Sequence, residues 1–102
     1  MTAPRDAMGE VAPHLRKITD ELVFGEIWER PQLSKRDRSL ITVAVLTALY
    51  RTGQLPGHFR RALDNGLSKE EIGELLTHVA FYAGWPTVAQ AVRIAQEAFD
   101  EE

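Results

Sequence analysis

The ten residues from Leu40 to Leu49 are apolar except for two threonines. Ser34, with Asp37 three positions later, has the pattern of an N-cap with an acidic partner and predicts a helix from about Lys35 to Tyr50. A helix without a polar face is a buried helix, so we expect the other elements to pack around it. A buried β-strand is the alternative for LITVAV, because several of its residues are β-branched. The length of the run and the cap before it favour the helix.

Helical spacing continues on both sides of this segment. Apolar residues recur on one helix face after Pro13, after Ser68 and again after Pro86, and the second of these segments opens with a capping-box pattern, SKEE. No strand-turn-strand pattern is present in the sequence. We therefore predict an all-α protein, a bundle of five to six helices. Residues 11–102 would form a single domain, preceded by a loose segment over residues 1–10.

The segment from Arg51 to Gly66, RTGQLPGHFRRALDNG, joins the apolar helix to a short basic one. It places three arginines and a histidine close together in a chain whose net charge is -3, which suits a small anion better than a nucleic acid. Pro56 favours a helix start and Gly66 its left-handed end. His58 would then lie in the first turn, where the helix dipole also favours an anion. The alternative is that His58 only packs.

The composition excludes several classes of function. The chain has no cysteine, which excludes disulfides, thiolate metal sites and thiol redox catalysis. Twelve Lys and Arg against fifteen Asp and Glu give no overall attraction to nucleic acid or anionic lipid. The first residues lack the apolar run of a signal peptide, and no apolar stretch reaches the length of a membrane span, so we expect a cytoplasmic protein. No two of the three histidines have ligand spacing on one helix, so we expect no metal.

Three stretches, VFGEIWERPQLSKRDRSLITVAVL, RALDNG and THVAFYAGWP, resemble the carboxymuconolactone decarboxylase family, small all-α proteins related to the AhpD-like alkylhydroperoxidases. The resemblance covers roughly Leu22 to Phe99. In the peroxidase branch a CxxC motif precedes a histidine, and an upstream glutamate lies on the preceding helix. Counted back from His58, the cysteines would fall at Arg51 and Gln54 and the glutamate at Ser39. The chain thus resembles the decarboxylase branch, which lacks the redox pair, and thiol peroxidase activity is not expected.

The resemblance implies decarboxylation of a small carboxylated lactone in the breakdown of protocatechuate, with no cofactor, because the substrate contains its own electron sink. It points to Arg36, Arg38, His58 and His78. Arginine suits the bidentate binding of a carboxylate, and Arg51 together with Arg36 or Arg38 would supply it. The alternative for Arg36, Arg38, Arg60 and Arg61 is a solvated charge or an ion pair with Asp37, Asp64 or a nearby glutamate.

Histidine suits the proton donor or the oxyanion stabiliser, and we expect His58 and His78 to share these roles. Gln54, one turn before His58, can donate an amide hydrogen bond to the same oxygen. Tyr82 and Trp85 follow His78 and complete the expected substrate-binding residues, with core packing as the alternative.

The sequence also departs from the family pattern. Gly53 and Gln54 stand where family members often have acidic residues. The alternative hypothesis is therefore a catalytically silent member that binds a small acid or serves as an interaction scaffold. The resemblance further implies a homo-oligomer, a trimer or a hexamer.

Overall fold

The computed structural model describes the backbone of residues 4–101 and the side chains of residues 7–101. Every regular element in this range is helical, which confirms the all-α prediction. Contacts divide the chain into two compact units, Met1–Lys35 and Arg36–Glu102. The boundary lies within residues 11–102, whose organisation as a single domain stays a prediction. Within the described range, no helix is both long enough and apolar enough to cross a membrane.

The first unit contains α1 (Pro4–Val11), α2 (Pro13–Ile18), the π-helix η1 (Thr19–Phe24) and the 3-10 helix η2 (Ile27–Glu29). As predicted, a helix opens at Pro13; it ends near Gly25, and its last part is a π-helix. Of the segment 1–10 that the sequence predicts to be loose, residues 4–10 belong to α1 and residues 1–3 lie outside the described range. Helix α1 is held because it packs against α2, and Thr19 Oγ1 lies 3.4 Å from Met8 Sδ.

The first unit has little core of its own. Trp28 is its one buried residue among those described, and the Trp28 ring stacks on Phe24 with 5.9 Å between the ring centroids. Its other large apolar side chains are exposed: Val11, Leu15, Ile18, Leu22, Val23, Ile27 and Leu33. The unit by itself therefore leaves much of its apolar surface uncovered.

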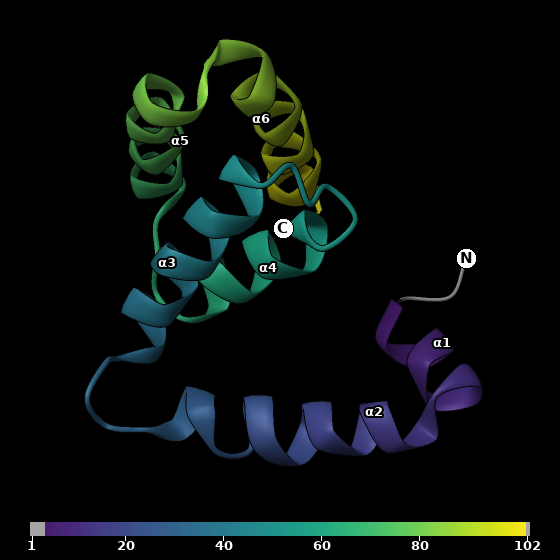
Figure 1. The fold of residues 1–102 in the computed structure, drawn as a ribbon. Helices are drawn as coiled ribbons and strands as arrows, with labels where there is room; N and C mark the ends of the chain where they lie inside the picture. The colour runs from purple at the N-terminus through teal and green to yellow at the C-terminus, as the bar shows by residue number, and fades with distance from the viewer. Residues whose placement is uncertain (1–3, 102) are drawn as a thin grey trace. The chain divides into compact units, whose positions relative to one another are not determined.

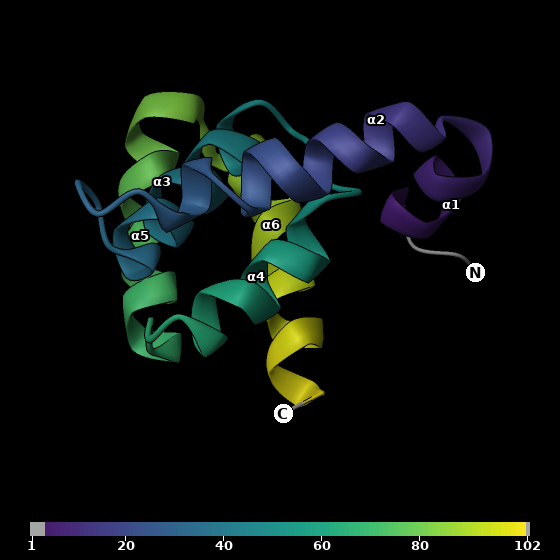
Figure 2. The same ribbon diagram turned by 90° about the horizontal axis from the view of Figure 1, so that it is seen from below.

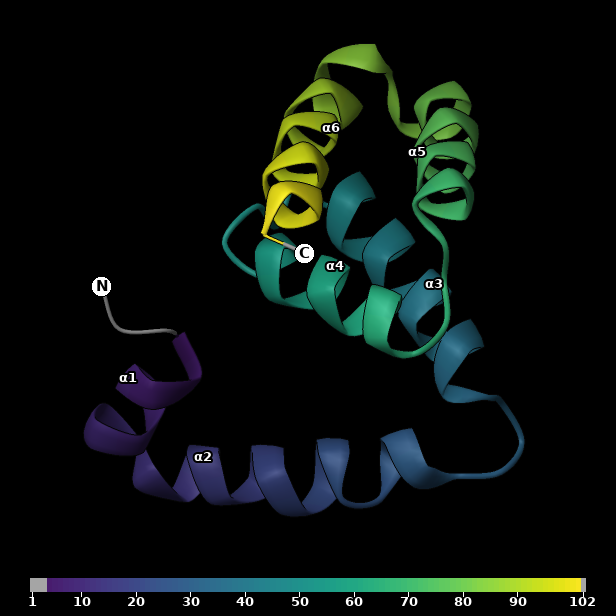
Figure 3. The same ribbon diagram turned by 180° about the vertical axis from the view of Figure 1, so that it is seen from behind.

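The second unit contains α3 (Lys35–Ala48), α4 (Leu55–Asp64), α5 (Lys69–Ala83) and α6 (Trp85–Asp100) (Figure 1). Helices α5 and α6 form a hairpin that turns at Gly84, whose φ of +95° is one that glycine adopts without strain. Figure 3 shows this hairpin from its open side. Helix α6 also packs against α4, and in Figure 2 it runs past α4 toward the C-terminus. The core is built largely from these helices: Val43, Leu55, Phe59, Ala62, Leu67, Ile72, Leu76, Val79, Ala80, Val88, Ala91, Ile94, Ala95 and Ala98.

Local signals fix the ends of these helices. Ser68 and Glu71 form the predicted capping box, in which Ser68 Oγ accepts a hydrogen bond from Glu71 N at 3.0 Å. Gly66, with φ +104°, provides the predicted left-handed end of α4, and the Leu67 N–H donates to Ala62 O across the turn. Tyr50 fills the corresponding position after α3 with φ +59°, which costs a residue with a side chain about 1 to 2 kcal/mol.

Helix α3 departs from the prediction of a helix buried on all sides. Ser39, Val43 and Thr47 are buried, but Ile41, Val45 and Leu49 are 50%, 48% and 58% exposed. These three residues follow one another at intervals of four and form one face, which the second unit by itself does not cover. The prediction is wrong for the second unit by itself, because its core is centred on α4, α5 and α6 and takes only one side of α3.

Candidate active site

A cavity of about 550 Å³ lies between α3 and α5. Most of its wall is apolar, formed by Leu40, Ile41, Ala44, Leu67, Leu75 and Val79. Four ionisable side chains also line it, Arg36 from the first turn of α3 and Glu71, Glu74 and His78 from α5. A cavity of this size accepts a small organic acid. It brings together two of the residues predicted from the sequence, Arg36 and His78.

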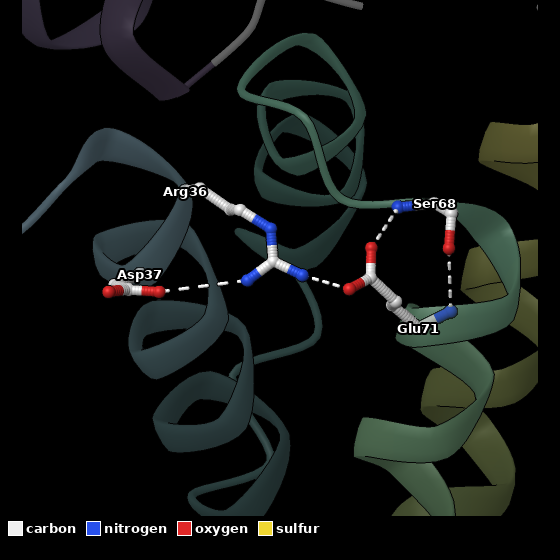
Figure 4. Close-up of polar contacts among 4 residues, drawn as sticks. All are labelled: Arg36, Asp37, Ser68 and Glu71. Carbon is white, nitrogen blue, oxygen red and sulfur yellow. Dashed lines mark hydrogen bonds and ion pairs between the residues drawn. The ribbon is translucent and has the colours of Figure 1, made fainter.

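The Arg36 side chain is held at the cavity by carboxylates. Arg36 Nη2 donates to Glu71 Oε2, and Arg36 Nη1 lies 3.6 Å from Asp37 Oδ1 (Figure 4). The other carboxylate oxygen of Glu71, Oε1, accepts a hydrogen bond from Ser68 N at 2.9 Å. The capping box of α5 and the arginine of α3 thus meet at one carboxylate, and the predicted alternative of an ion pair is confirmed for Arg36.

His78 lies on the exposed side of α5, seven positions after Glu71, so the two residues face the same way two turns apart. The His78 ring contacts Tyr82, with 5.1 Å between the ring centroids. Tyr82 itself is 81% exposed and does not line the α3/α5 cavity. Trp85 lines a second cavity of about 400 Å³, between α5 and α6, and its ring meets Phe81 edge to face.

His58 lies on α4, away from both of these cavities. The apolar face of α4 (Leu55, Phe59 and Ala62) is buried in the core, and His58 is half-buried beside it. Burial lowers the pKa of His58, and the nearby Arg61 guanidinium lowers it further. The structure does not bring His58 and His78 together in either cavity, and no residue from Arg51 to Gly66 lines either of them. His58 stays apart from these cavities because α4 packs against α6 through its apolar face, and His58 lies beside that face.

The remaining predicted site residues also lie outside the α3/α5 cavity. Gln54 is exposed at the N-cap of α4, where its side chain makes no capping hydrogen bond and its carbonyl accepts from His58 N at 3.3 Å. Arg51 is exposed at the start of the same loop, and Arg38 is half-buried on α3. Arg60, from the same basic segment, pairs with Glu101 at 2.8 Å.

Two carboxylates of the cavity, Glu71 and Glu74, were not predicted as site residues. The sequence around Glu71 indicates only a capping box. The available signal was spacing, because Glu71, Glu74 and His78 follow at i, i+3 and i+7 and therefore share one face of α5.

The sequence profile of the carboxymuconolactone decarboxylase family matches residues 13–97, which include every residue of the α3/α5 cavity. The chain belongs to this family. It is 44% identical to the 4-carboxymuconolactone decarboxylase of Acinetobacter baylyi over 86 residues, which make up 84% of this chain and 64% of that relative. It is 32% identical to the nitrosuccinic acid decarboxylase of Metarhizium robertsii over 99 residues, 97% of this chain and 68% of that relative.

The carboxymuconolactone decarboxylase family match confirms the resemblance based on VFGEIWERPQLSKRDRSLITVAVL, RALDNG and THVAFYAGWP, since all three stretches lie within the matched residues. In this family member, RDRSL begins α3 and carries Arg36, whereas THVAFYAGWP ends α5 and carries His78. Residues of two of the three stretches thus line the α3/α5 cavity, together with Leu67, Glu71, Glu74 and Leu75, which lie outside the stretches.

Proposed function

We propose that this family member is a decarboxylase that removes CO2 from a small carboxylated lactone of the 4-carboxymuconolactone type, without a cofactor, at the α3/α5 cavity. The observation that carries the proposal is that a guanidinium and an imidazole line one otherwise apolar cavity. The relatives named as decarboxylases support the same reaction class. The cytoplasmic location expected from the sequence belongs to this proposal.

The reaction needs an electron sink and a proton. When the bond between the ring carbon and the carboxylate breaks, CO2 leaves and the electron pair passes through the ring double bond to the lactone carbonyl, which gives a dienolate. A proton then adds at the carbon next to that carbonyl. One proton is consumed for each CO2 released, and no oxidant or reductant takes part.

Arg36 and His78 fit the two roles that remain for the protein. Glu71 and Asp37 occupy only part of the Arg36 guanidinium, which has five N–H donors, so donors remain to hold a substrate carboxylate. His78 can donate the proton or a hydrogen bond to the developing oxyanion. The apolar walls favour a step in which a carboxylate becomes neutral CO2.

The names of the two relatives are consistent with this class of substrate. 4-Carboxymuconolactone and nitrosuccinic acid each have two carboxyl groups and an electron-withdrawing group that can accept the electron pair. We infer that this chain also acts on a small dicarboxylate with such a group. The roles of Arg38, Arg51, Gln54, His58, Tyr82 and Trp85 stay predictions, because none of them lines the α3/α5 cavity.

Loss of ultraviolet absorbance on mixing the protein with 4-carboxymuconolactone tests the proposal. The variant His78→Gln should lower kcat by about 100-fold or more, the usual contribution of a general acid. His14→Gln, the same change at an exposed residue of α2, should leave turnover unchanged. Loss of activity in His58→Gln but not in His78→Gln would move the site to α4. No turnover by the wild type would favour the silent, acid-binding alternative.

We also propose that the protein self-associates, because the second unit by itself exposes two apolar surfaces. One is the Ile41, Val45 and Leu49 face of α3. The other surrounds the turn between α5 and α6, where Phe81, Tyr82 and Trp85 are 71%, 81% and 64% exposed.

Sedimentation equilibrium tests self-association and gives the subunit number, for which a trimer or a hexamer is expected. Val45→Lys should lower the mass, whereas Gln32→Lys, which adds the same charge at an exposed loop residue, should not. A wild type that sediments as a monomer at all concentrations would refute this part of the proposal.

A further inference from the structure

The Glu71 carboxylate joins two elements that are far apart in the sequence. Its Oε1 accepts from Ser68 N at 2.9 Å within the capping box of α5, and its Oε2 accepts from Arg36 Nη2 on α3 (Figure 4). Ser68 Oγ in turn accepts from Glu71 N at 3.0 Å. The cap therefore fixes the rotamer of Glu71, and the second oxygen is directed at α3.

Arg36 depends on that carboxylate for its direction. An arginine in the first turn of a helix is a long side chain with many rotamers, and ordering it costs up to about 2 kcal/mol. The Arg36 side chain is 39% exposed and that of Glu71 is 44% exposed. A pair this exposed contributes little to stability, about 0 to 1 kcal/mol. The effect of the pair is therefore to orient Arg36 rather than to stabilise the fold.

The direction imposed on Arg36 is toward the cavity that His78 also lines. Glu71 and His78 lie seven positions apart on α5, about 10 Å along the helix. Helix α5 thus fixes both ends of the site, His78 directly and Arg36 through Glu71. A small dicarboxylate held by Arg36 would have its reacting carbon toward His78.

We propose that Glu71 is a positioning residue for substrate binding: it holds the Arg36 guanidinium at the α3/α5 cavity and so sets the affinity for the substrate carboxylate. The inference deepens the proposed function and rests on it. Glu71 itself touches no reacting atom.

The sign of one measurement separates this role from simple electrostatics. Glu71 is a negative charge beside a site for an anion, so its removal should tighten anion binding if only Coulomb forces act. If Glu71 positions Arg36, its removal should weaken binding instead. Glu71→Gln suits this test because the amide oxygen can keep the hydrogen bond from Ser68 N, which leaves an NH2 group facing Arg36.

The experiment measures KM and kcat of the wild type, Glu71→Gln and Glu70→Gln with 4-carboxymuconolactone, and Kd for phthalate by calorimetry. Phthalate is a planar ring dianion without the electron sink that decarboxylation needs. Glu70 is exposed in the same turn, does not line the cavity and undergoes the same change of charge. We expect KM and Kd to rise about tenfold in Glu71→Gln, with kcat within about twofold, the result of lost ground-state binding. Glu70→Gln should not weaken binding.

Two further variants show whether the effect passes through Arg36. Adding Glu71→Gln to Arg36→Ala should give no loss beyond that of Arg36→Ala alone, because the two changes remove one interaction. Glu71→Asp keeps the charge but withdraws it by one methylene, so it should give a KM between those of the wild type and Glu71→Gln.

The outcomes separate failure of the inference from failure of the proposed function. If the wild type turns over the lactone and Glu71→Gln has an unchanged or lower KM, the inference is overturned and the function stands. If the wild type does not turn over the lactone, the proposed function fails and phthalate decides the inference. Weaker phthalate binding by Glu71→Gln supports it, whereas equal or tighter binding, or no binding to the wild type, overturns it.

Discussion

Replacing Phe59 by alanine should destabilise the protein more than the same change at Phe81. Phe59 is the largest fully buried side chain and lies on α4 between Leu55 and Ala62, at the centre of the core. Removal of a buried phenylalanine side chain costs about 3 to 5 kcal/mol, because the free energy of burying it is lost and the cavity left behind adds a further cost. Urea unfolding followed by circular dichroism measures this cost, and the midpoint should fall by about 2 to 3 M for a chain of this size.

Phe81 provides the matched control, because its side chain is 71% exposed in the single chain. Phe81→Ala should cost less than about 0.5 kcal/mol in dilute protein, as surface substitutions usually do. A cost that grows with protein concentration would show that an assembly buries Phe81. If Phe59→Ala leaves too little folded protein to measure, Phe59→Leu should still cost about 1 to 2 kcal/mol. Equal costs at the two positions in dilute protein would refute the assignment of the core.

Three further predictions concern single residues of the second unit. Because the pKa of His58 is lowered in the folded state, the unfolded chain binds more protons than the folded chain below about pH 6.5. The free energy of unfolding should therefore decrease as the pH is lowered through this range, by at most about 1.4 kcal/mol per pH unit, and urea unfolding of His58→Gln should lack this component. Ser68→Ala removes the acceptor of the capping box and should cost about 1 kcal/mol, a fall in Tm of about 4 to 8 °C by calorimetry, and an unchanged Tm would contradict the cap. An added Cβ meets no atom within 4 Å at Gly66 or Gly73, so the backbone conformation alone decides the effect of alanine there. Gly66→Ala should destabilise by about 1 to 3 kcal/mol because φ is +104°, whereas Gly73→Ala, inside α5, should stabilise by about 0.5 to 1 kcal/mol. The same sign at both positions in urea titrations would contradict the backbone assignment.

The features that the sequence predicts correctly depend on neighbours within about one helical turn. The capping box at Ser68, the left-handed Gly66 and the start of a helix at Pro13 all involve residues a few positions apart. In these cases the backbone groups to be satisfied and the side chains that satisfy them lie in the same short window, so local chemistry is sufficient. The apolar period after Ser68 similarly identifies Ile72, Leu76 and Val79 as core.

The exposure of α3 could not be predicted in this way. An apolar face is buried only if another element covers it, and nothing within Leu40 to Leu49 indicates that the core takes one side of the helix. The same reasoning applies to η1, since a π-helix over Thr19–Phe24 leaves no apolar period that distinguishes it from an α-helix. Both errors arise where the outcome depends on which elements meet.

The candidate site shows the same limit most clearly, because the residues that line it come from elements far apart in sequence. Arg36 and Glu71 are 35 positions apart, and only the packing of α3 near the start of α5 makes them partners. The family resemblance selected Arg36 and His78 as residue types with suitable chemistry, but not Glu71, whose local role as a cap fully accounted for it. A carboxylate has two oxygens, however, and a cap uses only one of them. Capping glutamates in other helical enzymes should therefore be inspected for a second partner before they are assigned to the fold alone.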